Sequence, residues 1–205
     1  MRTMIYMIRH GETNWNKERR FQGQMDIPLN EKGKLQATNI AKRFIEETLK
    51  IDAVYSSDLK RAKETAEEVA AKHQLEVVVN AGLRERHFGL LEGKKFEELN
   101  KVYPELHMGN LEQFESLNVE AFQLLQTRMV NTVKELCKHH MGQNIVIVSH
   151  GAAINSFLHG ITIGELGTGK TKLSNTSVSI VVYDHKDDRW EVIKVNDDIH
   201  NNSLI

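Results

Sequence analysis

The sequence is poor in the features that mark secreted and membrane proteins. Its single cysteine, Cys137, excludes an intramolecular disulfide, and we expect it to be a small buried residue of an amphipathic helix. No apolar run approaches the roughly 18 residues that a membrane-spanning helix needs. No long apolar segment follows the N-terminal Arg2, as it would in a signal peptide. These absences predict a cytoplasmic protein without a membrane partner.

An excess of charge of either sign is also missing. The chain has 27 lysine and arginine residues against 28 aspartate and glutamate residues, which gives a formal net charge of -1 at pH 7. This balance provides no overall attraction to nucleic acid, so we expect no nucleic-acid partner and infer that any bound anion is held by local geometry. His139 and His140 have no cysteine or carboxylate partners at ligand spacing, and we expect neither a metal nor a cofactor.

The order of the predicted elements indicates a single domain over residues 1–205. Strands are expected at 4–8, 53–55, 77–79, 144–149, 177–183 and 190–195, and helices at 31–49, about 58–73, 119–140 and 152–158. The apolar stripe of the first helix is expected at Leu35, Ile40, Ala41, Phe44, Ile45 and Leu49. A hydroxyl or carboxylate of 56–58 is expected to cap the second helix. Alternating strands and helices with a terminal hairpin predict an α/β three-layer sandwich, whose sheet is mostly parallel with one antiparallel strand. Residues 94–117 are expected to form a small insert over the C-terminal strand ends. The oligomeric state stays open.

The stretch 4–16 combines a buried strand with polar residues at its end. Five apolar residues, 4–8, are followed by Arg9, His10 and Gly11, and the glycine allows a sharp turn. In open α/β sheets, ligands bind at the C-terminal ends of the strands. Taken alone, the stretch fits an ordinary surface turn equally well.

Three more titratable side chains follow other predicted strands. Arg61 lies on the first turn of a helix, Glu85 lies in a loop, and His150 follows the apolar strand 144–149. Parallel strands deliver their C-terminal ends to one edge, so two arginines and two histidines can form a pocket for a dianion such as phosphate. A neutral imidazole can attack phosphorus, and a carboxylic acid can protonate the departing alkoxide. Individually, Arg61 could be a solvated helix residue and Glu85 the partner of its flanking arginines.

These residues occur in motifs that resemble the histidine phosphatase superfamily, the clan of cofactor-dependent phosphoglycerate mutases and related phosphatases. The motifs are Arg9-His10-Gly11-Glu12-Thr13 with Asn16, the pair Gln22-Gly23, Arg61 within 57–65, Glu85 within 83–93, and Ser149-His150-Gly151. They follow one another in order, and the resemblance spans about 4–177.

The resemblance implies a role for each matching residue. His10 would be the nucleophile that carries a covalent phosphoryl group, while Arg9, Arg61 and His150 would hold its oxygens and offset their charge. Glu85 would first protonate the leaving oxygen and then activate the second acceptor, which is water in a phosphatase. The substrate-binding residues would be Asn16, Gln22, Gly23 and Gly151.

A second pattern points to a different class of protein. Residues 164–171 satisfy the P-loop pattern G-x-x-x-x-G-K-T, so a P-loop nucleotide-binding protein is a remote alternative. A P-loop must open a helix whose N-terminus faces the phosphates, yet the next predicted strand begins at Ser177, only five residues (172–176) after Thr171. We therefore expect the segment to be a connection.

Within the superfamily, the sequence favours a phosphatase over a mutase. The mutases, as the family implies, are longer after the acid-bearing loop and carry extra basic residues there. Here the pattern at 88–93 and the compact insert are more similar to the phosphatases, and acidic insert residues would repel a second phosphate. These acidic residues are Glu97, Glu98, Glu105, Glu112 and Glu115. One departure is Phe114-Glu115-Ser116, where related phosphatases often have Gly-Glu-Ser.

The expected function is therefore metal-independent hydrolysis of a small phosphorylated metabolite through a covalent phosphohistidine. A cofactor-dependent phosphoglycerate mutase, which is an isomerase, is the main alternative. A non-catalytic phosphoryl-binding module is a third possibility, which the presence of both His10 and Glu85 disfavours.

Overall fold

The computed structural model describes residues 1–102 and 117–204, without the side chains of 202–204. Within these residues, six strands form one sheet in the order β3-β2-β4-β1-β5-β6. The strands are β1 (Arg2–Arg9), β2 (Ala53–Ser56), β3 (Val77–Val79), β4 (Asn144–Ser149), β5 (Val178–Asp184) and β6 (Arg189–Asp197). Strand β5 runs antiparallel to both of its neighbours, β1 and β6, and the other three pairings are parallel. The expected mostly parallel sheet with one antiparallel strand is confirmed.

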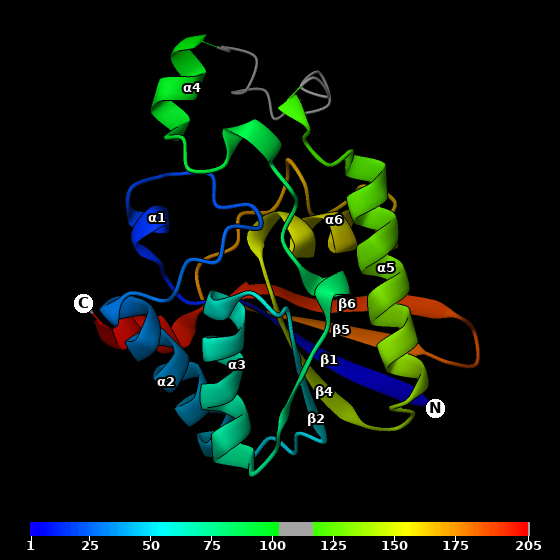
Figure 1. Cartoon of the computed structure of the whole chain (residues 1–205). Coiled ribbons are helices and arrows are strands. Elements are labelled where there is room, and N and C mark those ends of the chain that lie inside the picture. The colour runs from blue at the N-terminus through cyan, green and yellow to red at the C-terminus, as the bar shows by residue number, and fades with distance from the viewer. Residues whose placement is uncertain (103–116, 205) are drawn as a thin grey trace.

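Two pairs of helices cover the two faces of the sheet (Figure 1). Helices α2 (Glu31–Glu46) and α3 (Lys60–His73) cover one face, and α5 (Phe122–Lys138) and α6 (Gly151–Ile161) cover the other. Successive side chains of a strand point to opposite faces, so Tyr6 and Ile8 pack under α2 and α3 while Ile5 and Met7 pack under α5 and α6. Cys137 is fully buried in the second of these cores, as expected.

Two local expectations about the helices were wrong. Helix α2 ends at Glu46, and Leu35 and Ile45, which we expected in its buried stripe, are 48% and 46% exposed. A polar cap was expected before α3, but the capping residue is Leu59, and the Asp58 carboxylate instead accepts a hydrogen bond from Arg84 Nε at 2.8 Å. The backbone N–H of Lys60, the first residue of α3, donates instead to the carboxylate of Asp26 at 2.7 Å.

The predicted insert is described only in part. Its short helix α4 (Phe96–Val102) is joined to the loop after β1 by an isolated antiparallel bridge between Arg20 and Lys95. Pro104, Gly109, three of the acidic residues (Glu105, Glu112 and Glu115) and the 114–116 departure lie outside the described residues. The single-domain assignment of residues 1–205 stays a prediction.

The central strands bring two sequence motifs together. Strands β1 and β4 pair in parallel with Arg9 opposite Ser149, so the next residues, His10 and His150, leave the same edge of the sheet side by side. The P-loop-like segment leads instead into residues 171–174, which form no helix, so the helix that a P-loop requires is not there. In the described residues, none of the helices has both the length and the apolar character to cross a membrane.

Candidate active site

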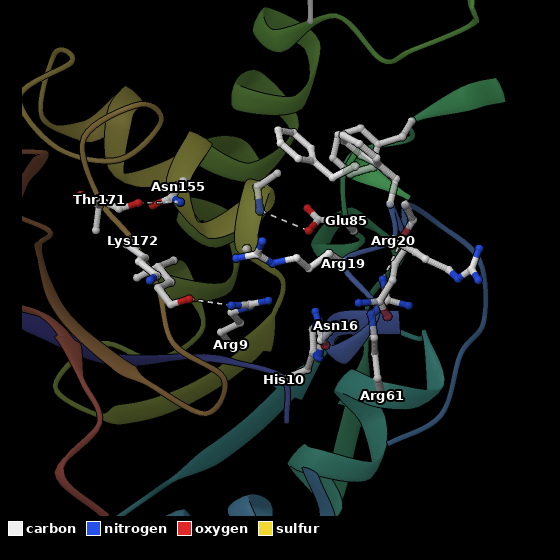
Figure 2. A pocket seen from close by; sticks show the side chains of 18 residues that line it. Arg9, His10, Asn16, Arg19, Arg20, Arg61, Glu85, Asn155, Thr171 and Lys172 are labelled. Atoms are coloured by element: carbon white, nitrogen blue, oxygen red, sulfur yellow. Dashed lines mark hydrogen bonds between the residues drawn. The ribbon is translucent and has the colours of Figure 1, made fainter. Parts of the chain in front are cut away.

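A cavity of about 680 Å³ opens where β1 and β4 end (Figure 2). Eight of the nine predicted site residues line it: Arg9, His10, Asn16, Gln22, Gly23, Arg61, Glu85 and Gly151. The ninth, His150, is fully buried beside the cavity, with its ring centroid 5.1 Å from that of His10. The structure thus collects residues from five separate motifs around one hollow.

The backbone around His10 fixes both the position and the protonation of its ring. The amide N–H of His10 donates to the carbonyl of Ser149 at 3.0 Å, and Nδ1 lies 2.7 Å from the carbonyl oxygen of Gly11. Because a carbonyl only accepts, Nδ1 must carry the proton, which leaves a lone pair on Nε2. Burial, together with the positive charges of Arg61 and Arg9, lowers the pKa of His10 well below its usual range. The ring is therefore neutral and nucleophilic at pH 7.

Gly11 lets helix α2 approach the nucleophile closely. A Cβ atom at Gly11 would lie 2.5 Å from the carbonyl oxygen of Gly33 on the first turn of α2. The amide N–H of Gly11 donates to the hydroxyl of Thr65 at 3.0 Å, and that hydroxyl in turn donates to the carbonyl of Arg61 at 2.7 Å. Gly11 therefore links the nucleophile's turn to the helix that carries Arg61.

Arg61 is wholly buried and aimed at the cavity by two backbone carbonyls. Its Nη1 donates to Met25 at 2.8 Å and its Nη2 to Gly23 at 2.7 Å. Gly23 has φ +53°, and a Cβ atom there would collide with the carboxylate of Glu92, so only glycine fits this turn. Burial lowers the pKa of Arg61 to about 10, which still leaves the guanidinium charged at neutral pH.

Several buried side-chain nitrogen atoms around the cavity have no hydrogen-bond partner in the described part of the chain. They are Nε of Arg9, Nε of Arg61 and both ring nitrogens of His150. Arg9 is anchored through Nη1, which donates to the carbonyl of Leu173 at 2.6 Å. Buried polar groups are normally paired, and an oxyanion bound between these side chains would accept hydrogen bonds from the two Nε–H groups and from the single N–H of the neutral His150 ring. Burial lowers the pKa of Arg9, and burial with the charge of Arg61 lowers that of His150.

The carboxyl group of Glu85 is held at the N-terminus of α6. Its Oε1 accepts hydrogen bonds from the backbone N–H groups of Arg86 and Ala153, both at 2.9 Å, and Oε2 accepts one from Ala152 at 3.2 Å. Arg84, which the sequence offered as an ion-pair partner, binds Asp58 instead. The Glu85 side chain is therefore placed by backbone contacts and faces the same cavity as His10 (Figure 2).

Comparison with known proteins agrees with this geometry. The family model of the histidine phosphatase superfamily (branch 1) matches residues 5–198. The chain belongs to this superfamily. The chain is 37% identical over 194 residues to a phosphoglycerate mutase-like protein 4 of Arabidopsis thaliana, covering 92% of this chain and 82% of that protein. It is 35% identical over 207 residues to a metal-independent phosphoserine phosphatase of the same plant, covering 98% and 84%.

Solved structures share the fold of this histidine phosphatase. A variant of the phosphoserine phosphatase of Entamoeba histolytica, in complex with phosphoserine, aligns with a TM-score of 0.82 and 30% identity. The alignment covers 97% of this chain and 98% of the other. The α/β architecture expected from the sequence is thus the architecture of solved members of the superfamily.

Sequence reasoning missed a group of residues that line the rest of the cavity. They are Arg19, Arg20, Phe21, Phe88, Phe96, Ala152, Asn155, Thr171, Lys172 and Leu173. Helical spacing was an available signal for Asn155, which lies four residues after Gly151 on α6. For the loop residues, no pattern in the sequence indicated that they fold over the strand ends.

Arg128 of α5 is another missed residue, and it fixes the loop that carries Glu85. Its Nη1 donates to the carbonyls of Gly82 and Arg84, both at 2.9 Å, and its Nη2 pairs with Glu120 at 2.9 Å. One arginine therefore holds both ends of the turn from which Glu85 reaches the cavity.

The charges that line the outer cavity differ from the expected ones. Of the acidic insert residues that are described, Glu97 and Glu98, neither lines the cavity, and Glu97 lies 4.0 Å from Arg19 in an exposed ion pair. Apart from Arg9, Arg61 and Glu85, the lining residues with charged side chains are Arg19, Arg20 and Lys172. The described residues therefore do not support our argument that acidic side chains repel a second anionic group.

Proposed function

We propose that this protein hydrolyses small phosphate monoesters through a covalent phosphohistidine on His10. The supporting observation is the neutral His10 ring, with its free Nε2, next to buried guanidinium groups whose Nε donors have no partner among the described residues. Such a pocket binds a phosphate dianion and presents a nucleophile to it. The names of the two plant relatives, one mutase-like and one a metal-independent phosphatase, support this class of reaction.

In the first step, Nε2 of His10 attacks phosphorus and forms the N–P bond. The bond between phosphorus and the ester oxygen breaks, and the departing alkoxide takes a proton from Glu85. Arg9, Arg61 and His150 stabilise the charge on the phosphoryl oxygens, with further hydrogen bonds from the residues around Asn16, Gln22, Gly23 and Gly151. In the second step, the Glu85 carboxylate takes a proton from water, whose oxygen attacks phosphorus. The N–P bond breaks, and His10 is released neutral with phosphate.

This mechanism requires no metal ion, because the two arginines supply the positive charge that a metal would otherwise provide. Among the described residues there is no group of three histidine, cysteine or carboxylate side chains suited to hold one. We propose a cytoplasmic enzyme with a small phosphorylated metabolite as its substrate.

A mutase is the second candidate, and the basic lining of the outer cavity favours it. Arg19, Arg20 and Lys172 could retain a substrate with a second acidic group while His10 returns the phosphoryl group to another hydroxyl. The two reactions share the first step and differ only in the acceptor.

The deciding experiment combines trapping of the intermediate with product analysis. The protein is mixed with p-nitrophenyl phosphate, quenched in alkali and digested, and we expect acid-labile phosphate on His10 in the wild type and none in His10→Ala. Activity should survive EDTA. With 3-phosphoglycerate, release of inorganic phosphate supports the phosphatase, whereas isomerisation primed by bisphosphoglycerate would establish the mutase. Labelling without turnover would favour a regulatory phosphoryl-binding module.

A further inference from the structure

Asn155 lines the cavity and has a buried hydrogen-bond acceptor without a partner among the described residues. Its Nδ2 donates to the carbonyl oxygen of Thr171 at 3.1 Å, and Figure 2 shows this contact at the cavity wall. Since that carbonyl can only accept, it fixes which end of the Asn155 amide faces it. The other end, Oδ1, is buried and has no partner among the described residues. Buried acceptors are normally paired, so this atom indicates a donor that arrives with a ligand.

The position of Asn155 on α6 relates it to the leaving group. Ala152 donates its backbone N–H to Glu85, and Asn155 lies three residues further along the same face of the helix. Glu85 protonates the leaving oxygen in the proposed mechanism, so the organic part of the substrate extends along this side of the cavity. Three helical residues correspond to roughly 4.5 Å along the axis. A hydroxyl or ammonium group on the carbon next to the esterified carbon is three bonds beyond the ester oxygen, and with its own hydrogen bond to an acceptor it can span a displacement of this size.

Several aromatic side chains line the cavities next to Asn155. A side cavity of about 300 Å³ shares Phe21, Phe88, Ala152 and Asn155 with the main cavity. The other residues that line it are Arg86, Phe122, Leu125, Thr168 and Gly169. The Phe21 and Phe88 rings are packed edge to face with centroids 5.1 Å apart. These rings can contact a carbon skeleton but cannot accept a conventional hydrogen bond from it. A substrate donor that lies against these rings finds no acceptor on them, whereas Asn155 Oδ1 is an acceptor without a partner among the described residues.

We infer that Asn155 determines substrate specificity by accepting a hydrogen bond from a hydroxyl or ammonium group on the carbon next to the esterified carbon. The inference rests on the proposed phosphatase function and adds the substrate class. Phosphate esters of amino alcohols and of polyols have such a donor, and simple alkyl phosphates do not. Phe21 and Phe88 cover the carbon atoms between the donor and the phosphate.

The test uses three esters that differ only at this position: ethanolamine phosphate, 2-hydroxyethyl phosphate and ethyl phosphate. kcat/KM for each is measured in the wild type, in Asn155→Leu, which keeps the branching at Cγ without the polar atoms, and in Asn155→Ala, which removes most of the side chain. Each variant is compared with the wild type on one ester at a time, which cancels differences in leaving-group reactivity. We expect both variants to lose about tenfold or more on the esters with a donor and less than about threefold on ethyl phosphate.

Two outcomes would overturn the inference. Equal losses on all three esters would make Asn155 a structural residue, and the absence of any loss would show that Oδ1 is not used. A larger loss on one donor ester than on the other identifies ammonium or hydroxyl as the natural donor. If the wild type hydrolyses none of the esters and His10 is not labelled, the proposed function fails and this inference fails with it. If the wild type hydrolyses the esters but the Asn155 variants lose the same activity on all three, the inference about Asn155 is rejected and the proposed phosphatase function stands.

Discussion

The Nδ1 atom of His10 lies 2.7 Å from the carbonyl oxygen of Gly11, and this contact decides which ring nitrogen can react. Nδ1 carries a proton, so the phosphoryl group must be attached to Nε2. We expect the trapped intermediate to show the NMR signature of phosphate on Nε2, measured by phosphorus–nitrogen correlation with labelled histidine. Phosphate on Nδ1 would contradict this assignment.

The role of Glu85 predicts a dependence on the leaving group. An alkoxide needs a proton from an acid in order to leave, whereas p-nitrophenolate leaves without one. Glu85→Gln should therefore lower kcat/KM for ethyl phosphate by about 10²- to 10⁴-fold and lower kcat/KM for p-nitrophenyl phosphate much less. In Glu85→Gln the second step lacks the base that activates water. With p-nitrophenyl phosphate, stopped-flow absorbance of this variant should therefore show a burst of about one p-nitrophenolate per enzyme before slow turnover. Glu97→Gln, which changes an exposed carboxylate, is the control. Equal losses on both esters would exclude Glu85 as the acid.

The unpartnered donors of the pocket predict stabilisation by inorganic phosphate. Phosphate bound to the folded state should raise Tm, and a concentration of 100 times Kd corresponds to about 2.7 kcal/mol of added stability. Arg61→Ala should abolish this shift because it removes a buried guanidinium group from the site. Arg2→Ala removes an exposed arginine that pairs with Asp184 and should retain the shift. The measurement is differential scanning calorimetry across a phosphate titration, and a full shift in Arg61→Ala would contradict the site.

The low pKa values of His10 and His150 predict that acid destabilises the free protein. As the pH falls through about 6.5, the unfolded chain takes up protons on these histidines and the folded protein does not. The free energy of unfolding therefore falls below pH 6.5, by about 1.4 kcal/mol per pH unit for each histidine until its folded-state pKa is reached. Neither histidine contributes above pH 6.5.

Urea unfolding between pH 7.5 and 5 measures this slope. His150→Gln should lose part of it, and His139→Gln, at an exposed position, is the matched control. Because His10 stays neutral in this range, the rate of phosphoenzyme formation should not decline near pH 6.5 through protonation of the nucleophile. The same slope in wild type and His150→Gln would show that His150 is accessible to protons in the folded state.

Local sequence patterns predicted the central strands correctly. They failed to predict features that depend on contacts between segments distant in the sequence. The apolar run of β4 gave its bounds correctly, since every residue after Asn144 is buried whatever packs on it. The buried positions of helix α2 were predicted less well, because they depend on which other elements pack against the helix. In the structure, Leu35 and Ile45 remain exposed. The expected cap before α3 is absent, because the Asp58 carboxylate pairs with Arg84, which is 26 residues away in the sequence.

The motif residues of the candidate site were predictable from the rule that parallel strands deliver their ends to one edge, although their roles stay predictions. The lining residues were not. Lys172 reaches the cavity only because the segment before it folds back over α6, where Gly167 packs against the carbonyl of Asn155. The sequence of that segment matches the P-loop pattern and predicted only a connection, without indicating that it contributes to the cavity.

By itself, the sequence determined the superfamily, the α/β order and the polar residues at the strand ends, because these depend on short-range spacing and hydrophobic pattern. Only the tertiary structure decided which nitrogen of His10 is free, that Glu85 sits on the N-terminus of α6, and that Asn155 Oδ1 is left without a donor among the described residues. Each of these depends on where a neighbouring backbone carbonyl or N–H group lies, and the fold of the whole chain sets those positions.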